Sequence, residues 1–258
     1  MTFRILLNHD FKNFIMNTKQ LTKTEEDITT MDCVNVEVSK SNGMDFSYDN
    51  NKTFKEVGHK GVTAEHSETL ERSTVTKAIA SGQFNTWDTD SIIDHIINTH
   101  HRYAKENAVV IYNLSQKVAH RHSKNHPEFA TLATEVFFFL HDLLNHMMKE
   151  EKTLFPNIRQ LIKSRKILGS PTQTTFGVMG DSVRLMQEHH SAVAKELKAL
   201  RQLTNNYRLP EDACNLCNHL FKKMQEFETG LIIHVHLESN ILFPKALAVD
   251  DQLNESVE

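Results

Sequence analysis

The sequence predicts an all-α protein whose main part is an antiparallel four-helix bundle. Glycine and proline are scarce, with 8 and 5 among 258 residues, so few positions interrupt helices. After residue 86, four long segments carry apolar residues at helical spacing, and short loops separate them. Long helices joined by short loops pack antiparallel to their neighbours, so a bundle is the expected fold.

Residues 1–85 differ from the rest of the chain. They are rich in Asn, Thr, Ser, Lys and Asp and show no sustained hydrophobic period. We expect a poorly ordered, largely irregular N-terminal region with one short helix over residues 68–81, which Gly82 stops. The bundle is expected over residues 86–248, and residues 249–258 form a C-terminal tail.

The first predicted helix begins near Thr89 or Asp90 and ends within residues 120–127. Pro127 opens the second helix, because proline suits the first turn of a helix, and this helix reaches about Ser164. Residues 168–177 then form a loop. The apolar stripe of the first helix is Ile93, Ile97, Ala104, Ala108 and Ile111.

The third predicted helix ends near Asn205. Pro210, Glu211 and Asp212 make the first turn of a fourth helix, which reaches about Leu247. The apolar stripe of the third helix is Val183, Met186, Val193, Leu197 and Leu200.

Composition and charge argue against several classes of partner. Hydrophobic residues make up 39% of the chain, which is enough for a sizeable core. The formal net charge is −4 and basic residues do not gather on one stretch, so neither nucleic acid nor an anionic membrane is expected as a partner. No apolar run reaches the roughly 18 residues of a membrane span. Asn8, His9 and Asp10 interrupt the N-terminus before the apolar core of a secretory signal forms. We expect a cytoplasmic protein.

The chain has three cysteines: Cys33, Cys214 and Cys217. An odd, low number indicates a reducing compartment rather than a disulfide framework. Cys214 and Cys217 form a C-x-x-C pair on a predicted helix, without a second pair to complete a zinc site. The sequence therefore favours two half-buried small residues at this place.

Two segments share the pattern H-x3-E-x3-L-F-P. One begins at His146 and contains Glu150; the other begins at His234 and contains Glu238, and 234 − 146 = 88 residues separate them. The same offset carries His101 on the first helix to position 189, which is also a histidine. The sequence therefore indicates two related helix pairs.

The spacing has a chemical meaning. Residues i and i+4 lie on one face of a helix, so each motif directs an imidazole and a carboxylate to the same place, on a face that is otherwise apolar. A buried glutamate is costly unless it is paired or bound to metal. Imidazole and carboxylate suit iron or manganese, and six ligands suit two ions with the glutamates bridging them. The predicted ligands are His101, His146, Glu150, His189, His234 and Glu238, and no catalytic residue is assigned.

Several neighbours leave alternatives open. His100 fits the apolar stripe of the first helix almost as well as His101, and the 88-residue offset favours His101. The offset likewise favours His189 over His190, and His234 over His236. Asp142 and Glu188 are candidates for orienting the ligands, with an ordinary surface role as the alternative. Pro156 and Pro244 are expected to bend their helices just past the ligands.

The strings HMMKEEKTLFPNI, EHH, PEDAC and HVHLESNILFPKA together resemble the Repair of Iron Centers family, over about Trp87 to Leu247. The resemblance implies a hemerythrin-like bundle with the six ligands named above. It implies two non-haem iron ions bridged by Glu150, Glu238 and an oxo or hydroxo group. It also implies a stress-response role, in which iron is supplied to repair iron–sulfur clusters damaged by nitric oxide or oxidants. Damaged iron–sulfur proteins or a cluster scaffold would then be the partners.

The sequence departs from this family at its front. Its members usually carry an N-terminal domain with a vicinal Cys-Cys pair, whereas this region has only Cys33, so a thiol-dependent step does not carry over. A non-enzymatic iron donor is favoured. A di-iron reductase of nitric oxide or peroxide, and a hemerythrin-like module that binds or senses dioxygen, remain as alternatives. The sequence leaves the oligomeric state open, a homodimer included.

Overall fold

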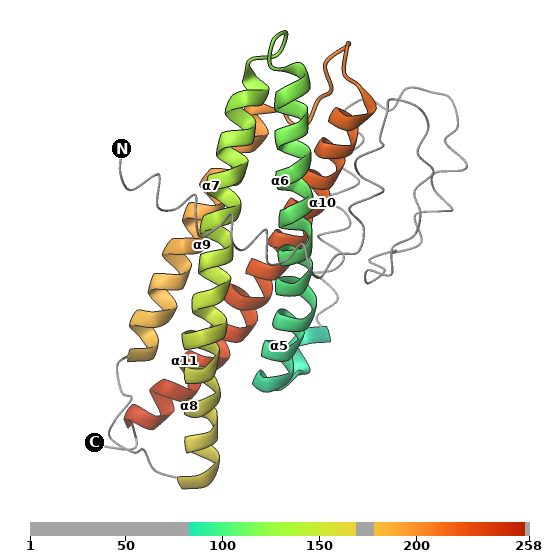
Figure 1. Ribbon diagram of the computed structural model, residues 1–258. Helices are drawn as coiled ribbons and strands as arrows, with labels where there is room; N and C mark the ends of the chain where they lie inside the picture. The colour runs from blue at the N-terminus through green and yellow to red at the C-terminus, as the bar shows by residue number, and fades with distance from the viewer. Residues whose placement is uncertain (1–82, 169–177, 256–258) are drawn as a thin grey trace.

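Figure 1 shows a computed structural model of the chain, which describes residues 83–168 and 178–255. Within these ranges all regular structure is helical, which confirms the predicted all-α class. The expected irregular N-terminal region up to residue 82 and its short helix over 68–81 lie outside the described residues. So does the loop expected over 168–177, except for Leu168, which is the last residue of α8 (Phe155–Leu168).

The first two long helices lie close to where the sequence predicted them. The 3-10 helix η1 (Gln83–Thr86) precedes α5 (Thr89–His95), and the Asp88 carboxylate caps α5 by accepting a hydrogen bond of 2.9 Å from the Ser91 N–H. The rod continues through the π-helical turn η2 (Ile96–His101) into α6 (Arg102–His122). The second rod consists of α7 (Glu128–Lys149), the π-helical turn η3 (Glu150–Leu154) and α8 (Phe155–Leu168).

The fourth rod departs from the prediction at both ends. It follows α9 (Val178–Leu203) and consists of α10 (Asn215–Leu237), the π-helical turn η4 (Glu238–Leu242) and α11 (Phe243–Glu255). The predicted first turn, residues 210–212, lies outside α10, and Asp212 there accepts a hydrogen bond of 2.8 Å from His126 in the loop between α6 and α7. The helix also runs past Leu247, so residues 249–255 of the expected tail are helical.

Each repeated motif contains a π-helical turn. The N–H of Phe155 bonds to the carbonyl of Glu150, and that of Phe243 bonds to the carbonyl of Glu238, five residues back in both cases. A proline follows each phenylalanine. Because proline has no N–H and its ring clashes with the carbonyl four residues earlier, the wider turn accommodates it inside a continuous rod.

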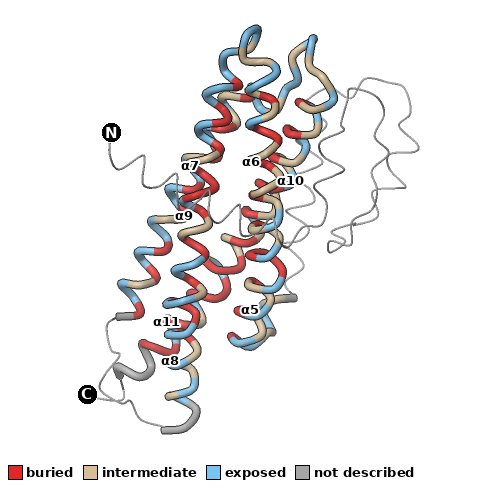
Figure 2. Tube along the Cα trace, in the orientation of Figure 1, coloured by how far each residue is buried: buried red, intermediate tan, exposed pale blue. Residues whose placement is uncertain are grey.

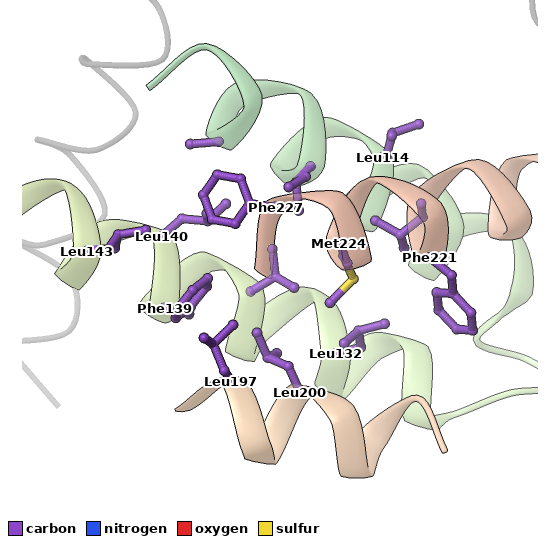
Figure 3. Close-up of a cluster of buried hydrophobic side chains, with 14 of the residues drawn as sticks. Leu114, Leu132, Phe139, Leu140, Leu143, Leu197, Leu200, Phe221, Met224 and Phe227 are labelled. Carbon is purple, nitrogen blue, oxygen red and sulfur yellow. The ribbon is translucent and has the colours of Figure 1, made fainter. Parts of the chain in front are cut away.

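The rods pack with their apolar stripes inward, as Figure 2 shows by burial. Helix α6 contacts α7 and α10, α7 contacts α9, and α11 contacts α8 and α9. The buried side chains form two apolar clusters. The larger cluster fills the half of the bundle that contains α6 and α10, and its members include Leu132, Phe139, Leu140, Leu197, Leu200, Met224 and Phe227 (Figure 3). The smaller cluster joins α5, α8, α11 and the first half of α9.

No helix in the described ranges is long and apolar enough to cross a membrane.

The larger cluster predicts the cost of a cavity. Leu140 is fully buried, so Leu140→Ala should lower the free energy of unfolding by about 2–5 kcal/mol, because the removed methyl groups leave a void among close-packed neighbours. Leu185→Ala is the matched control, since Leu185 is 46% exposed, and it should change stability by less than about 0.5 kcal/mol. Urea unfolding followed by circular dichroism measures both. Equal effects of the two changes would contradict the described packing.

Candidate metal centre

A layer of polar side chains lies between the two apolar clusters. On α9, for example, Met186 belongs to the smaller cluster and Val193 to the larger, and a buried histidine at position 190 lies between them. The glutamates Glu150 and Glu238 are both 0% exposed. Two carboxylates completely removed from water need compensating partners, so the side chains around them decide what the layer can do.

The layer contains two groups of ligand-type side chains. His101 and His234 form one group with the two glutamates, and within it the ligand atoms lie within 4.8 Å of one another. His146 and His190 form the second group with the same two glutamates, within the same limit. Because Glu150 and Glu238 belong to both groups, each can contribute one oxygen to either side. This sharing is the arrangement that two bridged metal ions require.

The repeated motifs account for the shortest distances within each helix. His146 Nε2 lies 2.9 Å from Glu150 Oε1, and His234 Nε2 lies 3.1 Å from Glu238 Oε1. Both pairs are spaced i, i+4, as the sequence indicated.

The other two imidazoles reach the glutamates from neighbouring helices. His101 Nε2 lies 3.4 Å from Glu150 Oε2, and His190 Nε2 lies 3.0 Å from Glu238 Oε2. Four helices therefore supply donors to one small volume. Within the part of the chain that the structure describes, these donors are imidazole nitrogens and carboxylate oxygens.

These donors fit metal ions better than they fit one another. The four carboxylate oxygens and the Nε2 atoms of His146 and His190 are buried and make no well-aligned hydrogen bond, although they lie close together. Buried polar atoms of folded proteins almost always have a partner, so this concentration of unsatisfied atoms calls for one. Nitrogen and oxygen donors without thiolate are the set preferred by iron or manganese.

The two carboxylates raise the pKa of each imidazole that reaches them from a neighbouring helix. Burial works to lower the pKa of His101, but the close Glu150 carboxylate and the hydrogen bond to Glu151 outweigh it and raise this pKa to about 9. His190 shows the same balance: burial opposes, and Glu150 and Glu238 raise its pKa to about 9. The carboxylates thus attract positive charge strongly at this level of the bundle.

The structure differs from the sequence prediction at one of the six positions. The 88-residue offset selected His189, whereas His190 is the buried residue that joins Glu150 and Glu238. His189 lies at the edge of the layer, with its Nδ1 3.3 Å from His146 Nδ1. The offset relates the two H-x3-E motifs correctly, because the histidine and the glutamate of each motif lie on one helix. It need not hold between rods, because the loop after α6 and the loop after α9 differ in length.

The structure also places His100 and His101 differently. His101 joins the two glutamates and His234, while His100 does not belong to either ligand group. His100 is buried beside the layer and its ring stacks on that of His234, with centroids 6.0 Å apart. Burial, helped by nearby His234, lowers the pKa of His100 to about 3, so its imidazole is neutral.

Comparison with known proteins agrees with this geometry. Residues 92–246 match the family of hemerythrin HHE cation-binding domains, and this range includes all the residues of the layer. The chain belongs to this family. The hemerythrin match also supports cation binding by the histidine and glutamate groups.

Individual relatives agree with the motif resemblance. The chain is 34% identical over 157 residues to a protein named iron-sulfur cluster repair protein YtfE from Yersinia pseudotuberculosis serotype IB (strain PB1/+). It is equally similar to the YtfE protein of Yersinia pestis (strain Pestoides F). In both cases the match covers 61% of this chain, and the chain spans 65% of the length of the relative. These relatives confirm the resemblance to the Repair of Iron Centers family.

The outer partners of this hemerythrin centre are residues that sequence reasoning missed. Glu151 Oε1 accepts a hydrogen bond of 2.7 Å from His101 Nδ1 and another of 2.7 Å from the Lys105 ammonium. The Ser239 hydroxyl lies 3.0 Å from His190 Nδ1. Since 151 + 88 = 239, the same repeat offset, applied to the residue after each glutamate, was the signal that could have found them. Such contacts orient an imidazole so that its other nitrogen faces the metal.

The predicted orienting residues lie elsewhere. Asp142 is exposed and accepts a hydrogen bond of 2.9 Å from His141, and exposed Glu188 accepts one of 2.9 Å from Arg184. Both have the ordinary surface role that was the alternative. The hydrogen bond from His101, together with Lys105, lowers the pKa of Glu151 to about 2 although burial opposes this, so Glu151 is the ionised partner in the outer layer.

The two adjacent histidines of α9 provide a matched test of the ligand set. His190→Ala should weaken iron binding by more than about 100-fold, because it removes a side chain that binds the metal directly. Losing a residue that only orients a ligand typically costs roughly 10–100-fold in affinity. His189→Ala should keep the wild-type iron content. Elemental analysis and competition with a chromophoric chelator measure both. Loss of iron in the His189 variant alone would restore the assignment made by the offset.

The outer hydrogen bonds give a smaller expected effect. Glu151→Gln and Ser239→Ala should each weaken metal binding by roughly 10–100-fold, because each substitution disturbs the hydrogen bond that orients a ligand imidazole. Glu188→Gln is the control and should leave the affinity unchanged. The readout is the dissociation constant from chelator competition. If the control and the two variants bound metal alike, Glu151 and Ser239 would have no role in orienting ligands.

Proposed function

We propose that this chain is a di-iron protein that supplies iron for the repair of iron–sulfur clusters damaged by nitric oxide or oxidants. One observation carries the proposal: Glu150 and Glu238 are completely buried and shared by two pairs of histidines. Sharing favours two ions over one, and the donor set favours iron. The proposed ligands are His101, His146, Glu150, His190, His234 and Glu238.

The same geometry supports release of iron. A carboxylate can change between bridging and terminal binding by rotating, without moving the helix that carries it. At each of the two places the remaining protein ligands are two histidines from different helices. An ion can therefore leave while the rods stay packed through the two apolar clusters on either side of the layer. This property suits a donor more than a tightly closed structural site.

The names of the relatives support the biological direction. Two Yersinia proteins that match over 61% of this chain are named iron-sulfur cluster repair proteins. We extend that role to this chain, with damaged iron–sulfur proteins as its general class of partner. No catalytic residue is assigned, because the described part of the layer consists of ligand-type residues and their hydrogen-bond partners.

The first test is metal content. Wild-type protein, produced with iron and purified without oxygen, should contain about two irons per chain, as in other di-iron bundles. Glu150→Ala combined with Glu238→Ala should lose both, because each ion loses two oxygen donors. Elemental analysis gives the content, and circular dichroism shows whether the helices persist. A wild-type protein that binds no iron under these conditions would overturn the proposal.

The second test is transfer. Protein loaded with iron-57 is mixed with a [4Fe–4S] enzyme that nitric oxide has inactivated, and the activity and the Mössbauer spectrum of the enzyme are followed. The donor role predicts recovered activity with iron-57 in the rebuilt cluster, faster than with an equal amount of ferrous salt. Turnover of nitric oxide or peroxide with an electron donor, without transfer, would identify a reductase instead. Reversible dioxygen binding without loss of iron would identify a carrier or sensor.

A further inference from the structure

A second cluster of ligand-type side chains lies at the other end of the bundle. His122 is the last residue of α6, and Cys214 and Cys217 lie at the start of α10. His122 Nε2 is 3.0 Å from Cys214 Sγ, and the two sulfurs are 4.0 Å apart. The three possible ligand atoms all lie within 4.8 Å of one another. The centre described above does not involve any of them.

The fold holds this cluster together from two directions. Cys214 has an extended backbone (φ −85°, ψ 170°) directly before α10, and the Cys217 N–H bonds back to the Cys214 carbonyl at 3.0 Å. This turn brings the two thiols to the same side. The His126–Asp212 hydrogen bond of 2.8 Å joins the loop after α6 to the segment before α10. Since α6 also packs along α10, the end of α6 delivers His122 to the thiols.

Burial leaves the cluster closed on one side and open on the other. Cys217 is completely buried, whereas Cys214 and His122 are partly exposed. Both loops that surround the cluster lie at the upper end of the bundle in Figure 1. A small ion can therefore reach the thiols from solvent, and a ligand position facing solvent stays available to water.

The electrostatics of the two thiols are unequal. Burial alone would raise the pKa of Cys214, but the N–H groups of Cys217 and Leu216 at the start of α10 lower it overall. Burial, and then the charge on Cys214, raises the pKa of Cys217 to about 11. Cys214 is thus the more acidic of the two thiols, and ionising both would place two negative charges side by side. A metal cation offsets these charges by replacing the protons.

We propose that His122, Cys214 and Cys217 bind a thiolate-preferring divalent cation of the zinc type. Zinc takes sulfur at about 2.3 Å and nitrogen at about 2.0–2.1 Å in a tetrahedron, which requires S···S of about 3.8 Å and S···N of about 3.6 Å. The observed distances are 4.0 Å between the two sulfurs and 3.0 Å between His122 Nε2 and Cys214 Sγ, and small side-chain rotations would bring them to the zinc-site values. Three protein ligands leave the fourth position to water, as in zinc sites that exchange a ligand.

This site is separate from the centre in the middle of the bundle. His101 and His122 mark the two ends of α6 (Arg102–His122), and 21 residues at 1.5 Å each place them roughly 30 Å apart. The chemistry differs as well, because the middle layer offers nitrogen and oxygen whereas this cluster offers two sulfurs. Soft thiolates select zinc-type ions over the harder ions that carboxylates hold. The two sites are thus expected to bind different metals and to be removable independently.

Cobalt titration tests the proposal on the whole reduced chain. Co²⁺ bound by two thiolates gives a near-ultraviolet charge-transfer band that nitrogen and oxygen ligands do not give, so Co²⁺ in the middle layer does not contribute. The wild type should develop this band, and Zn²⁺ should abolish it by displacement. Each of three single variants should weaken Co²⁺ binding by more than about 100-fold: Cys214→Ser, Cys217→Ser and His122→Ala. This effect is larger than the roughly 10–100-fold that is typical when a residue that only orients a ligand is removed.

The matched control is Cys33→Ser, a change to the third cysteine, which lies outside the described residues and should titrate like the wild type. Iron content and circular dichroism of every variant show whether the bundle remains folded. A band that persists in the Cys214→Ser, Cys217→Ser double variant would overturn the proposal. The proposal would also be overturned if the folded wild type gave no band and its Cys214 and Cys217 thiols reacted freely with a thiol reagent in the presence of Zn²⁺.

Discussion

The burial of Glu150 and Glu238 is the constraint on which the rest of this structure depends. Each carboxylate is completely removed from water, and an uncompensated charge in such a place costs several kcal/mol. Compensation must come from side chains at the same level of every rod, so the helices are held in one relative register. The apolar clusters above and below this level keep water out, which strengthens every interaction within it. Metal ions or protons on the imidazoles can both supply the missing charge.

The Leu-Phe-Pro part of each motif serves the same layer. The π-helical turns begin at the two glutamates and end where Phe155 and Phe243 follow. Each phenylalanine stacks on a histidine of another helix, Phe155 on His101 at 5.7 Å and Phe243 on His190 at 5.9 Å between ring centroids. The phenylalanines are therefore both core residues and walls of the layer. Because π turns are frequent at functional sites, their place at both glutamates agrees with a metal-binding role.

The two halves of the layer are related but unequal. On one side His101 donates to Glu151, an ionised carboxylate held by Lys105, whereas on the other His190 contacts the neutral hydroxyl of Ser239. A carboxylate partner makes an imidazole a more basic ligand than a hydroxyl does. Two metal ions in this layer would therefore experience different fields, although the backbone around them repeats.

The sequence by itself determined the four rods and the pairs His146–Glu150 and His234–Glu238, because the helical period places residues four apart on one face. Only the tertiary structure decided which side chains of neighbouring rods come into contact. It brought His190 rather than His189 to the two glutamates, and it joined His122 to the two cysteines. The physical reason is that register within a helix is set by covalent geometry. Register between helices depends on loop length, axial rotation and packing, which no local pattern encodes.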